Sequence, residues 1–373
     1  MMTDSPPGLY IHIPFCARRC GYCDFYSVEK RDYLKKYFEL LGREAGAYAS
    51  LFREFGTLYI GGGTPSLPEA DYINGVIDEI SGILPFMPGR EITIEVNPDD
   101  ITREKAVSYV SFGINRISVG VQSFDDDELS FLGRRHDSDT AVKAINILRS
   151  AGFSNLGTDL IFGFHNHTED SWRRTLERTL QFSPEHISCY QMTVSRSTGM
   201  GKLLAEGRIM EMPDDLQRKL FILADKILTE NGYLHYEISN YAKGEKYISK
   251  HNSRYWDRTE YLGLGPSAHS FRSDSRWWNV SSVEEYCGLL ERGGDPVSGR
   301  EELSQDQIHL EDLYLGFRTR KGVALSLIEH FISGEQILKG LVEDRLVSIK
   351  GEYAVPTLSG FLVADRLPLL FLK

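Results

Sequence analysis

Three cysteines lie within eight residues near the start of the chain, in the order Cys16-Ala-Arg-Arg-Cys20-Gly-Tyr-Cys23, directly after an apolar run. Thiolates are soft ligands that suit iron-sulfur clusters and zinc. Three thiolates would leave one iron of a four-iron cluster open to a further ligand. The spacing alone also allows a zinc ion completed by a distant histidine, or three unrelated buried cysteines.

A glycine run, Gly61-Gly62-Gly63-Thr64-Pro65, follows the next strand-like segment of the chain. Glycine lets the backbone approach a ligand more closely than any residue with a side chain would allow. The same run could serve as a tight turn between a strand and a helix. Its position one strand after the cysteines makes it a candidate for ligand contact.

Polar residues end or follow later strand-like segments, namely Glu95, Gln122, Arg134 and Asp159. A single acid or amide in such a position often only caps the following helix. Together, at the ends of neighbouring strands, they predict one shared site.

Short β-rich runs alternate with helical patterns through the first half of the chain. Strands separated by helices form a parallel sheet, either doubly wound or closed as a full or partial barrel. Loops at the carboxyl ends of barrel strands converge on one mouth, which favours a barrel here. We therefore predict an α/β fold built on a partial (β/α)6 barrel. Its strands should begin near Gly8, Thr57, Glu91, Arg116, Leu156 and His186.

The pattern changes after the sixth strand, and we expect three regions. Residues 1–210 should form the partial barrel, 211–300 an extension that flanks it, and 301–373 a small helical, winged-helix-like domain. The wing is predicted as a hairpin around Lys350 and Gly351. The last region mixes acidic and basic residues and has no basic stripe, which disfavours DNA binding.

The composition limits the kinds of partner that the protein can bind. Lys and Arg number 42 against 53 Asp and Glu, so a net charge of −11 gives no general attraction to nucleic acid or anionic lipid. No apolar run reaches the length of a membrane span, and no signal peptide is recognisable. Reduced thiolates also require a reducing compartment, so we predict a cytoplasmic protein. Cys189 and Cys287 lack metal-ligand spacing and are predicted to be structural.

The cysteine motif, with Tyr22 just before its last cysteine, resembles the radical-SAM superfamily. That resemblance implies a [4Fe-4S] cluster held by the three cysteines, whose open iron binds S-adenosylmethionine (SAM). Tyr10-x-His-Ile-Pro-Phe-Cys16 and the strand-end residues are similar to the coproporphyrinogen dehydrogenase branch of the superfamily. By this similarity, the residues that contact SAM or line its cavity are Tyr10, Tyr22, Gly62, Gly63, Thr64, Glu95, Gln122, Arg134 and Asp159.

A third motif, His251-Asn-Ser-Arg-Tyr-Trp256, resembles the HNxxYW motif of HemW-type haem chaperones, in which it is associated with haem binding. A histidine flanked by aromatic residues is more often a packed, hydrogen-bonded residue than a ligand. Neutral imidazole is nevertheless a common axial ligand of haem iron, which makes His251 a candidate and His269 its rival.

Two departures from the dehydrogenase pattern favour the chaperone branch. The dehydrogenase has a further cysteine two residues after its third ligand, where this chain has Phe25, and it has a long arm where only nine residues precede Tyr10. The resemblance therefore implies a haem chaperone that passes haem to acceptor proteins, respiratory proteins among them. The alternative is an oxygen-independent coproporphyrinogen III oxidase, or another radical-SAM enzyme acting on a tetrapyrrole.

Overall fold

A computed structural model describes residues 5–372, and in this range one sheet has twelve strands and a second has three. The centre of the large sheet consists of six consecutive parallel strands, as the alternating pattern predicts. Two of them, β2 and β3, begin a few residues earlier than the sequence suggested. The six strands are β1 (Gly8–Ile13), β2 (Phe55–Gly62), β3 (Phe86–Val96), β4 (Arg116–Gln122), β5 (Leu156–Phe162) and β6 (His186–Gln191).

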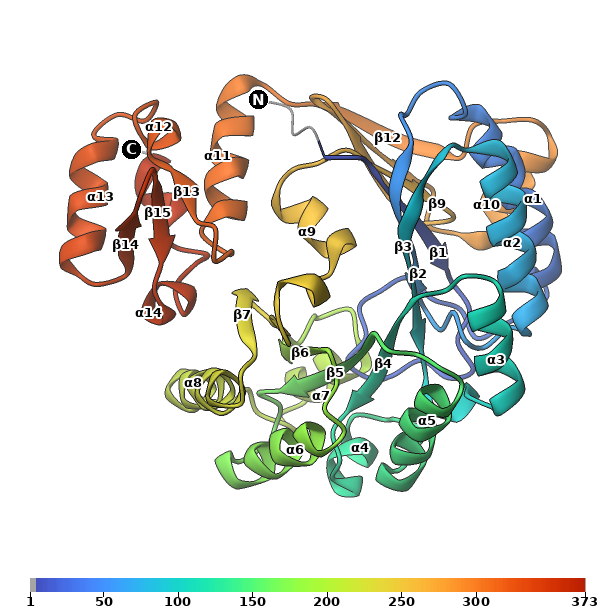
Figure 1. The fold of residues 1–373 in the computed structure, drawn as a ribbon, viewed down its shortest axis with the longest axis horizontal. Helices are drawn as coiled ribbons and strands as arrows, with labels where there is room; N and C mark the ends of the chain where they lie inside the picture. Colours follow the sequence, from blue (N-terminus) through green and yellow to red (C-terminus); the bar gives the residue numbers. More distant parts are fainter. Residues whose placement is uncertain (1–4, 373) are drawn as a thin grey trace.

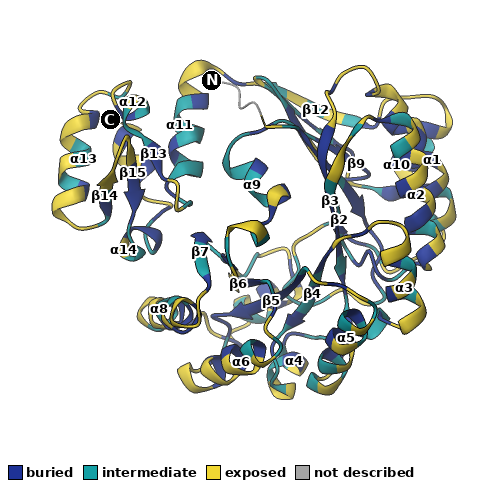
Figure 2. Cartoon of the chain, in the orientation of Figure 1, coloured by how far each residue is buried: buried dark blue, intermediate teal, exposed yellow. Residues whose placement is uncertain are grey.

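Helices cover the outer, convex face of this curved sheet (Figure 1). Alternate residues of each strand point to opposite faces, so Leu9, Ile11 and Ile13 of β1 all face the helices and are fully buried. Figure 2 shows the buried positions gathered in the strands and the exposed ones on the outer helix surfaces. The covering helices are α1 (Leu34–Ala47), α2 (Ala70–Ile83), α3 (Arg103–Ser111), α4 (Asp126–Phe131), α5 (Ser138–Ser150) and α6 (Glu169–Gln181), with the 3-10 helix η1 (Pro98–Asp100) before α3.

The following region extends the sheet at both edges. Strand β8 pairs antiparallel with β6, and β9 pairs parallel with β1, so the sheet curves without closing and ends at β12 and β7. Helix α9 lies on the concave side of the sheet (Figure 1). The elements are α7 (Gly199–Ala205), α8 (Asp214–Glu230), β7 (Leu234–Glu237), β8 (Asn240–Ala242), η2 (Glu245–Tyr247), α9 (Lys250–Trp256), β9 (Tyr261–Leu264), β10 (His269–Arg272), β11 (Ser275–Asn279), α10 (Val283–Glu291) and β12 (Val297–Glu302).

The last region has its own apolar core, which includes Leu313, Phe317 and Phe371. The predicted hairpin is present, with Lys350 paired to Tyr353 across its turn. No helix within residues 5–372 is both long and apolar enough to cross a membrane. The elements are α11 (Gln305–Gly316), β13 (Val323–Ala324), α12 (Leu325–Ile328), α13 (Gly334–Glu343), β14 (Val347–Lys350), β15 (Tyr353–Pro356), α14 (Leu358–Phe361) and η3 (Pro368–Leu372).

Candidate cofactor site

A cavity of about 480 Å³ opens at the carboxyl ends of the parallel strands. A volume of this size suits one drug-sized molecule. The cavity collects residues from every one of the six strands or from the loop that follows it. The predicted site residues that line it are Cys16, Cys20, Tyr22, Cys23, Gly62, Gly63, Thr64, Glu95, Gln122, Arg134 and Asp159.

The loop after β1 carries the three cysteines, and two of their sulfurs accept hydrogen bonds from neighbouring elements. The Thr64 hydroxyl donates to Cys16 Sγ at 3.4 Å, and Arg134 Nη1 donates to Cys20 Sγ at 3.6 Å. Donors at thiolate sulfur stabilise its negative charge and tune the potential of an iron-sulfur cluster. In the protein without metal, burial raises the pKa of the Cys16 and Cys23 thiols.

Within residues 5–372, no group of three or more His, Cys, Asp or Glu side chains is arranged to hold a single metal ion. The three cysteines therefore line one cavity without meeting at one point. In a four-iron cluster each thiolate binds a different iron, so such a cluster does not require them to meet. The thiol donors, their hydrogen bonds and the adjacent cavity fit a cluster of this kind.

The glycine turn after β2 leaves room for the cluster loop. Gly62 has φ +116°, in the left-handed region that favours glycine, and a Cβ there would lie 2.7 Å from His12 Nδ1. A Cβ on Gly63 would lie 3.0 Å from Cys16 Sγ. Gly63 N donates to the Ile13 carbonyl at 2.8 Å, which fixes the turn against the end of β1.

Two half-buried carboxyl groups, Glu95 and Asp159, face the cavity from β3 and β5. Glu95 accepts hydrogen bonds from the Tyr59 hydroxyl at 2.7 Å and from Gly62 N at 3.2 Å. Burial, together with the neighbouring Asp159, raises the pKa of Glu95 to about 7. Burial also raises the pKa of Asp159, which accepts a 2.8 Å hydrogen bond from Ser118. A positively charged ligand would favour the ionised form of both groups.

Arg134 supplies a half-buried positive charge beside the ends of β3 and β4. Its guanidinium bonds to the Gly120 carbonyl at 2.9 Å and also to the Asn97 side chain. A Cβ on Gly120 would lie 2.9 Å from the Gln122 amide nitrogen and 3.4 Å from Arg134 Nη2, so glycine leaves room for both side chains. Asn97 lines the cavity as well. Sequence reasoning did not single it out, although it follows Glu95 by two residues in EVNPD.

Gln122 has φ +68°, which is uncommon for a residue with a side chain and requires support from its surroundings. The next residue, Ser123, donates to Glu128 at 2.5 Å, and His167 Nε2 lies 3.5 Å from the same carboxyl group. His167 Nδ1 accepts from Gly163 N, and burial lowers its pKa to about 4. This network joins the loops after β4 and β5 behind Gln122.

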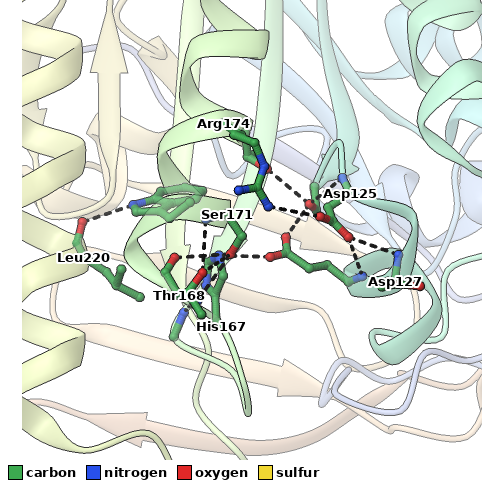
Figure 3. Close-up of polar contacts among 12 residues, drawn as sticks. Asp125, Asp127, His167, Thr168, Ser171, Arg174 and Leu220 are labelled. Atoms are coloured by element: carbon green, nitrogen blue, oxygen red, sulfur yellow. Dashed lines mark hydrogen bonds and ion pairs between the residues drawn. The ribbon is translucent and has the colours of Figure 1, made fainter.

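Figure 3 shows the wider network around His167. Asp125 caps α4 by accepting from Asp127 N at 3.1 Å, and Arg174 of α6 lies 3.5 Å from the same carboxyl group. Thr168 and Ser171 form the capping box of α6 directly after His167. The two helices that follow β4 and β5 are therefore anchored at the cavity end of the sheet.

Two predicted site residues do not line the cavity. The hydroxyl of Tyr10 is bonded to His12 Nδ1 at 3.0 Å, and its ring lies against those of Tyr59 and His251 on the concave side of the sheet. His251 lies on α9, next to Thr57 near the start of β2, and is 1% exposed. It is therefore at the end of the barrel away from the cysteines.

His269 has a different setting from His251. It begins β10, which lies two strands away from β1, and its side chain is exposed beside Trp278, with 5.9 Å between ring centroids. The remaining cysteines, Cys189 and Cys287, are buried in β6 and α10 and lie outside the cavity. All five cysteines are free thiols.

Comparison with known proteins places this chain in a family. The family model of the radical SAM superfamily matches residues 10–179. The heme chaperone HemW of Mycobacterium tuberculosis is 30% identical over 98% of this chain and 94% of its own, and HemW of Escherichia coli is 36% identical over 72% and 71%. The radical SAM enzyme coproporphyrinogen III oxidase (HemN) of Escherichia coli has the same fold, with a TM-score of 0.83 and 23% identity over 98% of this chain and 90% of its own. These matches confirm the predicted partial barrel and the resemblance stated from the motifs, and the chain belongs to the HemW family of heme chaperones within the radical SAM superfamily.

Proposed function

We propose that the chain binds haem, holds a [4Fe-4S] cluster ligated by SAM, and passes haem to acceptor proteins, respiratory proteins among them. The observation that carries the cofactor assignment is the cavity that joins three free thiols to a glycine turn and two carboxyl groups. Family membership supplies the haem chaperone activity. We also propose a cytoplasmic location, because the cluster thiols must remain reduced.

Cys16, Cys20 and Cys23 would hold the cluster, and their three thiolates would leave one iron available to SAM. When bound, the cluster supplies an electron to the sulfonium of SAM. Glu95 and Asp159 provide negative charge for a positively charged ligand, and the turn at Gly62 leaves its backbone accessible. The remaining residues proposed for this site are Tyr22, Gly63, Thr64, Gln122 and Arg134, and Tyr10 lies outside the cavity.

We choose between the two candidate haem ligands by the accessibility of their ring nitrogens. Both ring nitrogens of His251 are already hydrogen-bonded, Nδ1 to Thr57 at 2.8 Å and Nε2 to Tyr255 at 3.0 Å. Ligation by His251 would require the bond to Tyr255 to break and α9 to move. His269 presents its ring at the surface beside Trp278, where an apolar macrocycle could stack. We therefore place His269 ahead of His251 as the axial ligand.

Anaerobic titration of the cluster-loaded protein with haem, followed by absorption spectroscopy, tests the proposal. We expect saturable binding by the parent, a weakened complex with an altered Soret band for His269→Ala, and parental binding for His251→Ala. His330→Ala, which removes an exposed histidine of the C-terminal region, serves as the matched control. A parent protein with an intact cluster and no saturable haem binding would refute the chaperone assignment. Loss of the haem complex only in His251→Ala would instead assign the ligand to α9.

The enzymatic alternative has its own decisive assay. Anaerobic protein with SAM, a reductant and coproporphyrinogen III would yield protoporphyrinogen if the chain were the decarboxylase. We expect no such product.

A further inference from the structure

Helix α9, which carries the HNxxYW motif, is attached to the inside of the barrel at the strand ends opposite the cofactor cavity. The backbone amides of Lys250 and His251 donate to the two oxygens of Glu91, at 3.3 and 3.0 Å. The Ser249 hydroxyl caps the helix by accepting from Asn252 N. Glu91 and Glu95 belong to the same face of β3, since residues four apart on a strand point the same way.

The His251 ring is held in place and is neutral. It is stacked on Tyr59 with 4.9 Å between ring centroids and 25° between planes. Burial lowers its pKa to about 3, so the ring carries no charge at neutral pH. With its nitrogens bonded to Thr57 and Tyr255, the ring has a defined orientation and no free donor or acceptor.

Tyr59 carries the contact from His251 to the cavity. Its hydroxyl donates to Glu95 Oε1 at 2.7 Å, while Glu95 Oε2 accepts from Gly62 N at 3.2 Å. There is little free space beside the ring, because a Cβ on Gly61 would lie 2.9 Å from Tyr59 Cε1. A shift of the Tyr59 ring would therefore displace the carboxyl group of Glu95 and release the glycine turn.

We propose that His251 is a positioning residue for the SAM site, acting through Tyr59 on Glu95 and on the backbone of Gly62. The proposal rests on the proposed SAM site and is independent of haem binding. It gives the HNxxYW motif a role that its buried location can perform: the motif sets the geometry of the cofactor cavity from the far end of the barrel. In this role the imidazole contributes through its stacked ring.

The SAM affinity of the reconstituted protein tests this positioning role. The affinity is measured by equilibrium binding and by the change that SAM makes in the electron paramagnetic resonance spectrum of the reduced cluster. Tyr59→Phe removes the hydrogen bond to Glu95 and keeps the ring, and we expect about tenfold weaker binding. His251→Gln removes the stacked ring and should weaken binding to a similar extent. His251→Phe keeps a stacked ring without any nitrogen and should stay within about twofold of the parent, because the stack is retained.

The matched control is His235→Gln. His235 is also stacked on a tyrosine, at 4.2 Å from Tyr241, and is bonded to Asp225, but none of these residues lines the cavity. It should lose thermal stability and keep parental SAM affinity. Combining His251→Gln with Tyr59→Phe should weaken SAM binding little beyond either change alone, because both act on one contact path.

Parental SAM affinity in either His251→Gln or Tyr59→Phe would overturn the proposal. Weak SAM binding in His251→Phe would also overturn it, since the nitrogens and not the ring would then matter. If His251→Gln yields no folded protein, Tyr59→Phe and His251→Phe decide the question together. A parent that binds SAM but not haem would refute the chaperone function and leave this inference standing, so the two failures are distinguishable.

Discussion

Replacing Glu95 with glutamine is the sharpest single perturbation of the proposed SAM site. Glutamine has nearly the same size as glutamate, so the packing at the end of β3 is preserved. Glu95 accepts two hydrogen bonds, from the Tyr59 hydroxyl and from Gly62 N, and a glutamine can accept only one of them through its single oxygen. E95Q therefore removes the negative charge and also turns an NH2 group toward one donor.

The expected loss follows from the charge. A hydrogen bond to a charged group contributes about 1.5–3 kcal/mol, against about 1 kcal/mol for a neutral pair. Losing the carboxylate opposite a cationic ligand should therefore weaken SAM binding by about ten- to a hundredfold. Equilibrium binding of SAM to the cluster-loaded protein measures this, with iron content showing that the cluster is retained.

The pH dependence gives a second, independent readout of the same group. The pKa of Glu95 is about 7 in the protein without ligand, so below this pH the group holds a proton that a cationic ligand must displace. SAM affinity of the parent should then fall as the pH drops from about 8 to 6, and affinity of E95Q should stay nearly constant over this range. Parental affinity in E95Q, or a parent whose affinity does not change over this range, would refute the role given to Glu95.

The folding stability of E95Q shows whether its weaker SAM binding comes from the site or from a damaged fold. Because the pKa of Glu95 is higher in the folded state than its usual 4.5, its contribution to stability is full below about 4.5 and is lost as the pH rises through about 7. E95Q should therefore be no less stable than the parent above pH 7, and its weaker SAM binding there would not reflect a damaged fold.

Three further predictions concern the surrounding fold. Gly63→Ala should lower iron content in a folded protein by crowding a cluster thiol, whereas Gly75→Ala on α2, where a Cβ has free space, should not. Burial raises the pKa of Glu237 to about 8, so the stability that this group contributes should be lost as the pH rises from about 4.5 through 8. By pH 9 the parent should have lost on the order of 5 kcal/mol of unfolding free energy through this group. Glu237→Gln lacks this loss, so its thermal unfolding should depend less on pH. Replacing buried Cys189 or Cys287 with alanine should cost about 1 kcal/mol of stability and leave iron content unchanged.

Local pattern was enough to predict the centre of the fold. Each parallel strand combines apolar residues that face the helices with polar ones that face inward, and this alternation is visible in the sequence of β1 from Leu9 to Ile13. Since carboxyl ends of parallel strands share one edge, the polar residues that follow them could be assigned to one site from the order of residues alone. The cavity that collects eleven of those predicted residues agrees with this reasoning.

The edges of the sheet and the inner contacts were not predictable in the same way. β9 joins β1 across about 250 residues of chain, and no local pattern encodes such a pairing. Tyr59 lies on the same face of β2 as Thr57, and its bond to Glu95 depends on the register between β2 and β3. The left-handed backbone of Gln122 likewise depends on contacts between separate loops.

The position of α9 restricts how the HNxxYW motif can work. The ring of His251 is inside the barrel, and the helix is held from the other side by the C-terminal region, where Lys321 contacts Asp257 at 2.9 Å and Arg258 contacts Asp312 at 2.8 Å. An axial ligand must present a free nitrogen to a flat macrocycle, and both nitrogens of the buried His251 ring are already hydrogen-bonded. An element that touches the C-terminal region at one end and Tyr59 at the other is instead well placed to connect them. We therefore expect a change at the C-terminal region to reach the cofactor cavity through α9.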